Sequence, residues 1–390
     1  MNKIEVLIEE LCPEGVEYKE LREIFKISRG RVMSKEYLRD NVGEYPVYSS
    51  QTADNGEIGK IDTYDYDGEY LTWTTDGANA GTIFYRFGKF SITNVCGLLK
   101  LKVKDIISRF AYYYLSISMK SFVSSGMGNP KLMSNVVQKI QIPIPSLEIQ
   151  QEIVNILDKF SELEAELEAE LEARRKQYEY YRNQLLTPIE VGGKWFMNGN
   201  EVEWKTLGEI GNICMCKRVM KNETKPTGDV PFYKIGTFGK VADAFISNEL
   251  YNDYKNRFSY PKVGEILLSA AGTIGRTVVY DGEPAYFQDS NIVWLSNDES
   301  KVTNKFLFHY YKIIVWKTDG GTILRLYNEN LAKTKIPIPS LSEQERIVGI
   351  LDKFDALVND ISEGLPAEIE ARRKQYEYYR NKLLTFKEKE

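Results

Sequence analysis

The side chains best suited to catalysis or metal binding are scarce and scattered in this chain. His309 is the one histidine of 390 residues, so a His-rich metal site is impossible. A Ser-His-Asp or Cys-His pair could be built only around that residue. Cys214 and Cys216 lack a second Cys/His pair to complete four ligands. We therefore interpret His309 as structural and both thiols as buried or incidental.

Motifs for nucleotide binding and methyl transfer are also incomplete. The run Gly272-Thr-Ile-Gly275-Arg276 lacks the Gly-Lys-Ser/Thr ending of a phosphate loop, and turn chemistry predicts a tight turn between strands instead. Asn129-Pro130-Lys131 is not the Asn/Asp-Pro-Pro-aromatic motif of adenine methyltransferases, and no Pro-Asp/Glu-x-Lys-type nuclease cluster stands out. The sequence therefore favours a recognition protein, with no catalytic and no metal-binding residue predicted.

The strongest feature of the sequence is an internal duplication. Two short blocks recur 194 residues later, and a twelve-residue block recurs unchanged 198 residues later, so the second copy contains four extra residues. The paired blocks are 142–147 with 336–341, 156–160 with 350–354, and 172–183 with 370–381. The segments between them diverge, although Arg31-Val-Met33 still matches Arg218-Val-Met220. Fixed connectors between divergent parts indicate one scaffold that presents two different readers.

Each near-identical segment is predicted to begin a long helix. Pro145-Ser146 and Pro339-Ser340 end an extended stretch and supply an N-cap, and Glu343 would complete a capping box with Ser340. Apolar residues then recur every three or four positions, as in a coiled-coil seam. The 40 residues from Leu147 to Leu186 contain no proline or glycine. As a helix they would form a rod of ~60 Å.

The second copy of this helix is less regular. Gly364-Leu365-Pro366 should break or kink it, with Pro366 restarting a helix in its first turn. A pattern of this length needs a partner helix to bury its apolar seam. Two near-identical helices in one chain are natural partners, and we expect them to pack antiparallel.

The divergent segments 15–141 and 201–335 are rich in β-branched and aromatic residues. Turn signals such as Asp67-Gly68, Asp281-Gly282 and Gly320-Gly321 separate their strand-like runs. Strands are predicted at 68–74, 81–85, 265–269 and 277–280, and helices at 106–117 and 305–316. This pattern predicts two α+β domains with a mostly antiparallel sheet.

The acidic net charge lies in the helical segments. The chain carries 51 Lys+Arg and 56 Asp+Glu, a formal charge of −5. Residues 142–190 hold 11 acids and 5 bases, and residues 336–390 hold 11 acids and 9 bases. The remainder is therefore +3, which permits contact with DNA without establishing it. We divide the chain into globular segments 1–141 and 191–335 and helical segments 142–190 and 336–390.

The same composition bears on the compartment. No apolar run approaches the ~18 residues of a membrane span, and the first residues lack a signal-peptide core. Four cysteines in 390 residues do not form a disulfide framework. We expect a cytoplasmic protein without a membrane segment.

The doubled connector resembles the specificity (S) subunit of type I restriction–modification systems. The resemblance rests on Ile-Pro-Ile-Pro-Ser-Leu, Ile-Leu-Asp-Lys-Phe and Glu-Ala-Arg-Arg-Lys-Gln-Tyr-Glu-Tyr-Tyr-Arg-Asn, each present twice, and covers essentially the whole chain. It implies that each divergent segment is a target recognition domain and that two long antiparallel helices hold these domains apart. It also implies a subunit with no catalytic residue that reads a bipartite, asymmetric DNA site.

The resemblance further implies partners that carry the chemistry. Two modification (M) subunits would bind S-adenosylmethionine and methylate adenine N6, and restriction (R) subunits would supply an ATP- and Mg²⁺-dependent translocase and endonuclease. This chain would need no cofactor of its own. Identical stretches suit the docking of two identical M subunits. The residues predicted to bind these partners are Arg174, Tyr178, Tyr181, Arg372, Tyr376 and Tyr379. The competing interpretation is that their sameness reflects helix–helix packing alone.

Base-reading residues are expected among polar and basic side chains on the loops of each domain. In the first domain we predict Arg29, Arg31, Lys35, Ser50, Gln51, Thr75 and Asn79. In the second domain we predict Arg218, Lys221, Lys234, Thr237, Thr273, Arg276 and Arg325. Arg31 and Arg218 are the best pair because the Arg-Val-Met match places them in both copies. For each residue the alternative is an ordinary solvated charge or turn former.

Two other classes of function remain as alternatives. A coiled-coil scaffold or adaptor that binds no DNA would share the helical segments. A stand-alone enzyme is disfavoured by the missing cofactor and metal motifs. A gel shift in the presence of M subunit separates the first alternative, and a methylation assay on the isolated chain separates the second.

Overall fold

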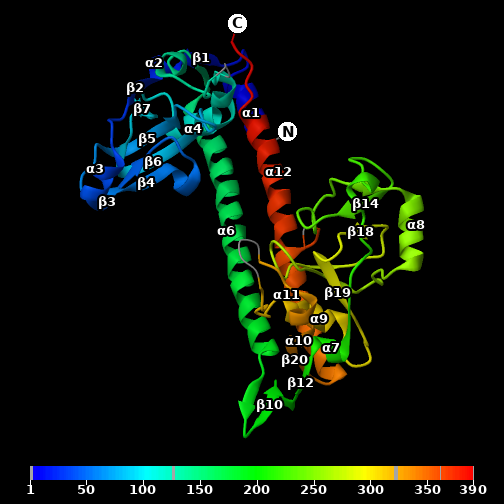
Figure 1. The fold of residues 1–390 in the computed structure, drawn as a ribbon. Coiled ribbons are helices and arrows are strands. Elements are labelled where there is room, and N and C mark those ends of the chain that lie inside the picture. The colour runs from blue at the N-terminus through cyan, green and yellow to red at the C-terminus, as the bar shows by residue number, and fades with distance from the viewer. Residues whose placement is uncertain (1–2, 125–127, 320–323, 361, 390) are drawn as a thin grey trace. The chain divides into compact units, whose positions relative to one another are not determined.

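The computed structural model describes residues 3–124, 128–319, 324–360 and 362–389. The chain divides into two compact units (Figure 1). The first unit comprises Met1–Glu168 with Glu368–Glu390, and the second comprises Ala169–Ala367. Each unit therefore combines one globular domain with parts of the long helices. The predicted Gly320-Gly321 turn lies outside the described residues.

The first unit is built around a six-stranded sheet with the order β2-β7-β5-β6-β3-β4. Helix α4 packs against this sheet, and Trp73, Leu99 and Phe110 lie in the core between them. The elements of this domain are α1 (Lys3–Leu11), β1 (Glu17–Glu20), α2 (Leu21–Ile24), β2 (Phe25–Arg29), α3 (Lys35–Asp40), β3 (Val42–Tyr48), β4 (Glu57–Ile61), β5 (Tyr66–Thr74), β6 (Ile83–Ile92), β7 (Cys96–Leu101), α4 (Ser108–Ser118), α5 (Ser134–Val137) and β8 (Gln141–Ile144).

The second unit repeats this plan with a four-stranded sheet, β13-β19-β16-β17, and a separate three-stranded sheet, β15-β14-β18. Its elements are β9 (Ile189–Val191), β10 (Lys194–Met197), β11 (Asn200–Glu201), β12 (Glu203–Thr206), α7 (Leu207–Ile210), β13 (Gly211–Cys214), β14 (Val230–Tyr233), β15 (Phe245–Ile246), α8 (Asn248–Arg257), β16 (Ile266–Ser269), β17 (Thr277–Val279), β18 (Tyr286–Phe287), β19 (Ile292–Asn297), α9 (Asn304–Tyr311), α10 (Asn328–Lys333) and β20 (Lys335–Ile338).

The structure confirms the α+β class, with one addition in each domain. Strand β3 pairs parallel to β6, and β14 pairs parallel to β18, while the other strand pairs are antiparallel in the part of the chain described. In the first domain β6 is one ten-residue strand that joins both halves of the sheet. In the second domain Asp281-Gly-Glu-Pro284 interrupts the equivalent strand between β17 and β18. Proline has no backbone N–H, so it cannot continue the ladder there.

The structure confirms the two predicted long helices and the break in the second. Helix α6 runs from Leu147 to Leu186 without a break. The second copy forms α11 (Leu341–Asn359) and α12 (Leu365–Leu383), which separate at the expected Gly364-Leu365-Pro366 sequence. Helix α9 ends at Tyr311 and not at Trp316 as expected, so that prediction was five residues too long.

The helices pack antiparallel within each unit. In the first unit Phe160 of α6 contacts Tyr376 and Tyr379 of α12. Later residues of α6 meet an earlier residue of α12, because Arg373 pairs with Glu164 and Glu168. In the second unit Tyr178 of α6 contacts Phe354 of α11. Farther along the chain, Asn198 donates to both the Leu185 carbonyl and Glu343, which lies near the start of α11.

The helix starts confirm the serine caps and correct the capping box. The Ser340 hydroxyl accepts from the backbone N–H of Glu343 at 3.4 Å. The Glu343 carboxylate, however, accepts from Arg346 at 2.7 and 2.8 Å and from Asn198 at 3.0 Å. A charged arginine is a stronger partner for a carboxylate than a backbone amide. The expected reciprocal bond from Glu343 to the N-cap backbone is therefore replaced.

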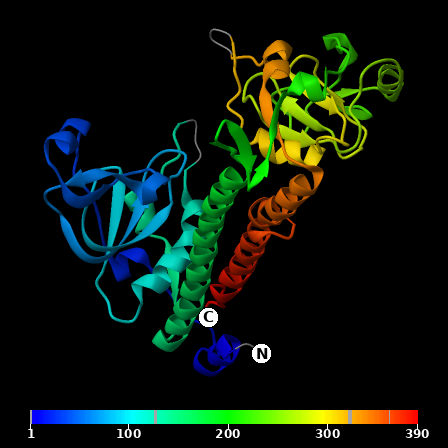
Figure 2. The same ribbon diagram turned by 90° about the horizontal axis from the view of Figure 1, so that it is seen from below.

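The Ile-Pro-Ile-Pro segments form the same strand pair in both units. Strand β8 pairs with β1 in the register Glu17↔Ile144, and β20 pairs with β12 in the register Glu203↔Ile338. Each pair anchors the start of a long helix to its own globular domain. In the first unit this region also joins the two ends of the chain, since Val16 bridges Glu388 and the Val16 N–H donates to the Lys387 carbonyl at 2.9 Å (Figure 2).

A buried glutamine fixes the entry to each long helix. Gln150 is fully buried, and its amide donates to the carbonyls of Asp105 at 2.9 Å and Pro145 at 2.8 Å. Its oxygen accepts from the Ile107 N–H at 2.8 Å. Gln344 makes the same three bonds in the second unit, to Lys301, Pro339 and Thr303, each at 2.9 Å. We call these two residues the clamp glutamines. They were not predicted as functional positions, although the glutamine that follows each repeated Pro-Ser-Leu sequence was a visible signal.

Candidate nucleic-acid interface

The first domain brings Ser50 and Thr75 together beneath one loop surface. The Ser50 hydroxyl donates to the Val95 carbonyl and accepts from the Thr75 N–H at 3.2 Å. Thr75 is fully buried, and its hydroxyl lies 2.9 Å from the same carbonyl. Both hydroxyls therefore hold loops in place in this structure. Their predicted role as base readers stays a prediction.

Gln51 and Asn79 lie on the same two loops and bond other loop atoms. The Gln51 amide donates to the Glu57 carbonyl at 2.5 Å. The exposed Asn79 amide donates to the Thr52 hydroxyl at 3.1 Å. Between Gln51 and Glu57, Asp54 and Asn55 both have positive φ, of 48° and 54°. Such a conformation persists only where its surroundings fix it.

The basic residues predicted to read bases in the first domain lie between the end of β2 and the start of α3. The exposed Arg31 pairs with Asp65, with Nε at 3.0 Å, and donates to the Tyr37 hydroxyl at 3.2 Å. Arg29 donates to the Ser134 hydroxyl at 3.3 Å. Lys35 is exposed in the first turn of α3. Arg31 is thus an oriented and accessible guanidinium.

The second domain holds its matching arginine in the same way. The Arg218 Nε donates to Asp289 at 2.8 Å, and 66% of the arginine side chain remains exposed. Asp289 precedes Ser290, which has a positive φ of 55°. Lys221 is exposed three residues after Arg218. The Arg-Val-Met repeat therefore corresponds to a repeated Arg–Asp pair, formed with a different segment in each domain.

Some of the remaining predicted residues of the second domain lie at the surface, and others hold loops in place through hydrogen bonds. Lys234 pairs with Asp243 at 2.8 Å, while the Thr237 hydroxyl caps the turn back to Lys234. Arg276 donates to the Phe238 carbonyl at 2.9 Å, so it fastens this loop. Thr273 is exposed in the loop between β16 and β17, which confirms the predicted turn around Gly272 and Gly275.

Arg325 has a counterpart in the first domain, Lys131, which lies 194 residues earlier and was not among the predicted base readers. The Leu326 N–H donates to the Ala270 carbonyl at 2.9 Å, and the Leu132 N–H donates to the Thr75 carbonyl at the same distance. The neighbouring bridges are Ala271↔Arg325 in the second domain and Asp76↔Lys131 in the first. Lys131 therefore stands where Arg325 stands. The same backbone frame carries threonine, aspartate and lysine in one domain and two alanines and arginine in the other.

Arg86 was also missed by the sequence reasoning. Its side chain is 3% exposed, donates to the Asn55 carbonyl at 2.7 Å and lies 3.6 Å over the Tyr48 ring. Its Nη1 is buried without a hydrogen-bond partner among the described residues. Burial lowers the pKa of Arg86. The guanidinium thus holds the carbonyl of Asn55, a residue with positive φ. The sequence signal was weak, because Arg86 stands in a strand that also contains Lys89 and Ser91.

The repeated tyrosines of the helices pack against a repeated phenylalanine. Tyr178 and Tyr181 stack on Phe354 in the second unit, with centroids 6.3 and 5.6 Å away. Tyr376 and Tyr379 contact Phe160 in the first unit. Tyr178 is buried, whereas Tyr181 is 40% exposed. Helix packing therefore accounts for much of the repetition at these four positions.

The repeated arginines differ from the tyrosines because they lie at the surface. Arg174 pairs with Glu170 at 3.2 Å and donates to Gln177 at 2.9 Å. Arg372 pairs with Glu368 at 3.6 Å and donates to Gln375 at 3.2 Å. Both side chains are more than 40% exposed and bond only residues of their own helix in the part of the chain described. They remain the better candidates for docking a partner.

His309 is buried beside a partly exposed polar cluster, as its interpretation as a structural residue predicted. It is fully buried, and its Nε2 lies 2.7 Å from Asp352. Nearby, Lys312 pairs with Asp355 at 2.7 Å, and Tyr178 donates to the same carboxylate at 3.0 Å. Burial, which outweighs the hydrogen bond to Asp352, lowers the pKa of His309. The cluster ties α6, α9 and α11 together within the second unit.

The repeat also corresponds to a known protein family. The family described as type I restriction modification DNA specificity domain matches twice, at residues 13–173 and 200–371. The chain belongs to this family. A protein of Haemophilus influenzae named as a type I restriction enzyme specificity subunit is 47% identical over 384 residues, covering 95% of this chain and 96% of that protein. A Mycoplasma pneumoniae protein named as a type I specificity subunit is 35% identical over 371 residues, covering 93% and 96%.

Solved structures share the fold of this specificity subunit at low sequence identity. The S subunit of a type I restriction–modification system from M. genitalium has a TM-score of 0.59 and 17% identity, covering 95% of this chain and 96% of that chain. A second structure, from work on the assembly of a type I restriction–modification system, has a TM-score of 0.58 and 15% identity, covering 95% and 97%. These similarities confirm the two-domain fold predicted from the duplication.

The family assignment confirms that the chain is a specificity subunit and not an enzyme. Within the described ranges, no group of three or more His, Cys, Asp or Glu side chains has a metal-binding arrangement. Cys214 and Cys216 are free thiols. A search of the described helices for a segment able to span a membrane finds none.

Proposed function

We propose that this specificity subunit reads a bipartite, asymmetric DNA site, with one half-site for each domain. The proposal rests on one observation: the two domains share the same backbone hydrogen bonds in these loops but carry different side chains on them. Equivalent backbone bonds at Leu132 and Leu326 hold loops whose side chains differ between the domains. Because base recognition depends on side-chain donors and acceptors, equal frames with unequal side chains should select different bases.

Arg31 and Arg218 are the proposed leading base readers. A guanidinium can donate two parallel hydrogen bonds to guanine, which makes arginine the commonest specific contact in the major groove. In each domain an aspartate holds the guanidinium while leaving much of it exposed. Such a partner orients the side chain before DNA arrives, and the Asp65 and Asp289 carboxylates would also repel phosphates that approach in the wrong register.

The partners of this subunit are proposed to be DNA, M subunits and R subunits. Two M subunits would dock on the repeated helical segments through Arg174 and Arg372, one at each copy. S-adenosylmethionine, ATP and Mg²⁺ would then be held by those partners in the cytoplasm, and this chain would hold no cofactor. A 40-residue helix of ~60 Å is long enough to set the spacer between two half-sites that lie one or two DNA turns of ~34 Å apart.

The deciding experiment maps N6-methyladenine across a genome in which this chain and its M subunit are expressed. The expected result is one bipartite motif with two different halves and a fixed nonspecific spacer. A palindromic motif, or no methylation with a stable M–S complex, would contradict the proposal. A stable complex that shifts no DNA would favour the adaptor alternative.

Two matched variants assign the halves. Arg31→Ala should relax base preference in one half-site only, and Arg218→Ala should relax the other, each by ~1–3 kcal/mol of discrimination. Lys205→Ala removes a partly exposed lysine on β12, which pairs with Glu203, and serves as the control. If either arginine variant relaxes both halves equally, its assignment to one half is wrong.

The docking sites are tested by counting M subunits. Arg174→Ala and Arg372→Ala should each yield complexes with one M subunit, and the double variant should yield none. Lys176→Ala, on the same repeated stretch, is the control. Wild-type stoichiometry in the double variant would leave helix packing as the sole explanation of the repeated sequence.

A further inference from the structure

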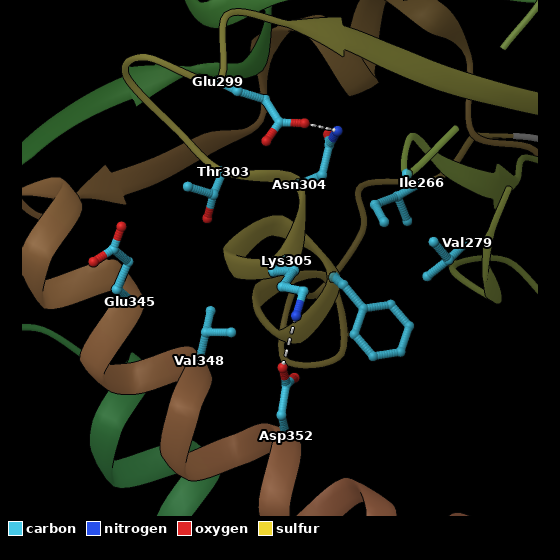
Figure 3. A pocket seen from close by; sticks show the side chains of 11 residues that line it. Ile266, Val279, Glu299, Thr303, Asn304, Lys305, Glu345, Val348 and Asp352 are labelled. Carbon is cyan, nitrogen blue, oxygen red and sulfur yellow. Dashed lines mark hydrogen bonds and ion pairs between the residues drawn. The ribbon is translucent and has the colours of Figure 1, made fainter. Parts of the chain in front are cut away.

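A cavity of about 520 Å³ opens in the second unit between the sheet and the long helix (Figure 3). Ile266 and Val279 line it from β16 and β17, and Val348 and Asp352 line it from α11. Asn304 and Lys305, at the start of α9, complete its wall. None of these side chains is among the predicted DNA-binding or M-docking residues.

The equivalent place in the first unit is filled by the chain itself. Strand registers align Tyr85 with Val279 and Glu69 with Gly264, because β5 pairs Leu71 with Tyr85 and β16 pairs Ile266 with Val279. The Tyr85 ring lies 6.2 Å from the Tyr112 ring and beneath the Arg109 guanidinium at 4.7 Å. Its hydroxyl donates to Glu69 at 2.6 Å. The first unit thus seats a phenol at this position.

The second unit keeps the surroundings of that phenol and lacks the phenol itself. The clamp glutamines align the two helices so that Lys305 replaces Arg109 and Phe308 replaces Tyr112. Val279 is 44% exposed, and Gly264 also lines the cavity. The second unit therefore keeps an aromatic ring at Phe308 and a cation at Lys305, but the place that Tyr85 fills in the first unit is open.

A buried polar atom marks how an occupant would be held. Asn304 lines the cavity and is 7% exposed, and its amide nitrogen donates to Glu299. Its Oδ1 has no hydrogen-bond partner among the described residues. This oxygen has almost no accessible surface, so an occupant reaches it only by displacing the atoms around it. An unpaired buried acceptor is costly, so an occupant that then donates a hydrogen bond to it gains more than an apolar occupant does. The carboxylate of Glu299 fixes this orientation of the amide, because the reverse would place two oxygens together.

The rim of the cavity is acidic. Glu299 and Glu345 are both exposed at its edge, whereas Lys305 is already paired with Asp352 at 3.4 Å. This charge favours an occupant with basic groups beside its ring. We propose that the cavity binds a tyrosine or tryptophan side chain, flanked by lysine or arginine, from a partner polypeptide.

The test titrates the full-length chain with small probes by saturation-transfer NMR. The probes are p-cresol, toluene, and the peptides acetyl-Lys-Tyr-Lys-amide and acetyl-Ser-Tyr-Ser-amide. We expect saturable binding in the millimolar range, p-cresol ahead of toluene, and the lysine peptide about fivefold tighter than the serine peptide. Binding of p-cresol without the peptides would overturn the polypeptide partner, and no saturable binding would overturn the site.

Two variants locate the binding. Val279→Tyr copies the first unit and should weaken p-cresol binding about tenfold, whereas Val279→Thr, which keeps the side-chain size, should leave it within about twofold. Asn304→Ser copies Ser108 of the first unit and should abolish the preference for p-cresol over toluene. The Asn304 measurement stands even if Val279→Tyr does not fold. Unchanged p-cresol affinity in folded Val279→Tyr, or an unchanged preference in Asn304→Ser, would refute the proposal.

Discussion

Replacing a clamp glutamine should destabilise one unit and spare the other. Gln150→Met keeps the length and volume of the side chain but removes three buried hydrogen bonds, to Asp105, Pro145 and Ile107. Two lost bonds at about 1 kcal/mol each and an unpaired buried N–H at ~1–3 kcal/mol give a loss of ~3–5 kcal/mol. Gln344→Met should cost the same, because its three bonds are equivalent.

The assay is urea unfolding followed by fluorine NMR of 5-fluorotryptophan. Trp73 is the one tryptophan of the first unit, and Trp195, Trp204, Trp294 and Trp316 report on the second. With a denaturant slope of ~2 kcal/mol per molar urea, Gln150→Met should lower the Trp73 midpoint by ~1.5–2.5 M. Gln344→Met should instead lower the midpoint of the other four signals.

The control is the neighbouring Gln151, which is exposed and donates only within its own helix, to Asn155. Gln151→Met should change stability by no more than ~0.5 kcal/mol. The reasoning is refuted if Gln150→Met shifts Trp73 no more than Gln151→Met does. It is also refuted if either clamp variant shifts the signals of both units by the same amount.

Three further predictions use the same assay. Below pH ~6.5 the unfolding free energy of the second unit should fall by up to ~1.4 kcal/mol per pH unit. The pKa of His309 is lowered in the folded state, so the unfolded chain binds a proton at a pH where the folded chain does not. His309→Tyr, which copies Tyr113 of the first unit, should reduce this dependence on pH. Arg86→Met should leave the unfolding free energy of the first unit, read from the Trp73 signal, unchanged or raise it by up to ~2 kcal/mol, because it removes a buried cation. Amide exchange near Asn55 should accelerate, and a large loss of stability would contradict this prediction. Gly97→Ala should lower the unfolding free energy of the first unit by ~1–3 kcal/mol, because the new Cβ would lie 2.2 Å from the Trp73 ring. A neutral result would show that the ring can move.

Much of the fold followed from local sequence patterns. The uninterrupted period of three and four residues predicted α6 to its last residue, and Gly364-Leu365-Pro366 predicted the break between α11 and α12. These features depend on backbone geometry and on neighbours within a few positions. The capping box at Ser340 failed because Arg346 and Asn198 compete for Glu343, and Asn198 is far away in the sequence.

The candidate site was less predictable than the fold. The polar types at Thr75 and Arg86 gave no sign that one is buried under a loop and the other under a strained carbonyl. Lys131 and Arg325 are separated by 194 residues, the offset of the repeated blocks, but only the equivalent backbone bonds show that they occupy the same place in the two domains. The exposure of a side chain and its hydrogen-bond partners depend on segments tens of residues away, so they cannot be predicted from residue types alone.

The sequence by itself determined the duplication, the helix lengths, the α+β class and the family, because identity and periodicity are properties of the chain. Only the tertiary structure decided which part of α6 packs against which partner helix, and which side chains of two equal frames face solvent. It also decided that Tyr85 fills a place that Val279 and Gly264 leave open. The physical reason is that burial depends on contacts between residues that are distant in the sequence. The structural effect of a small change at one position therefore depends on the side chains that surround it in the folded protein.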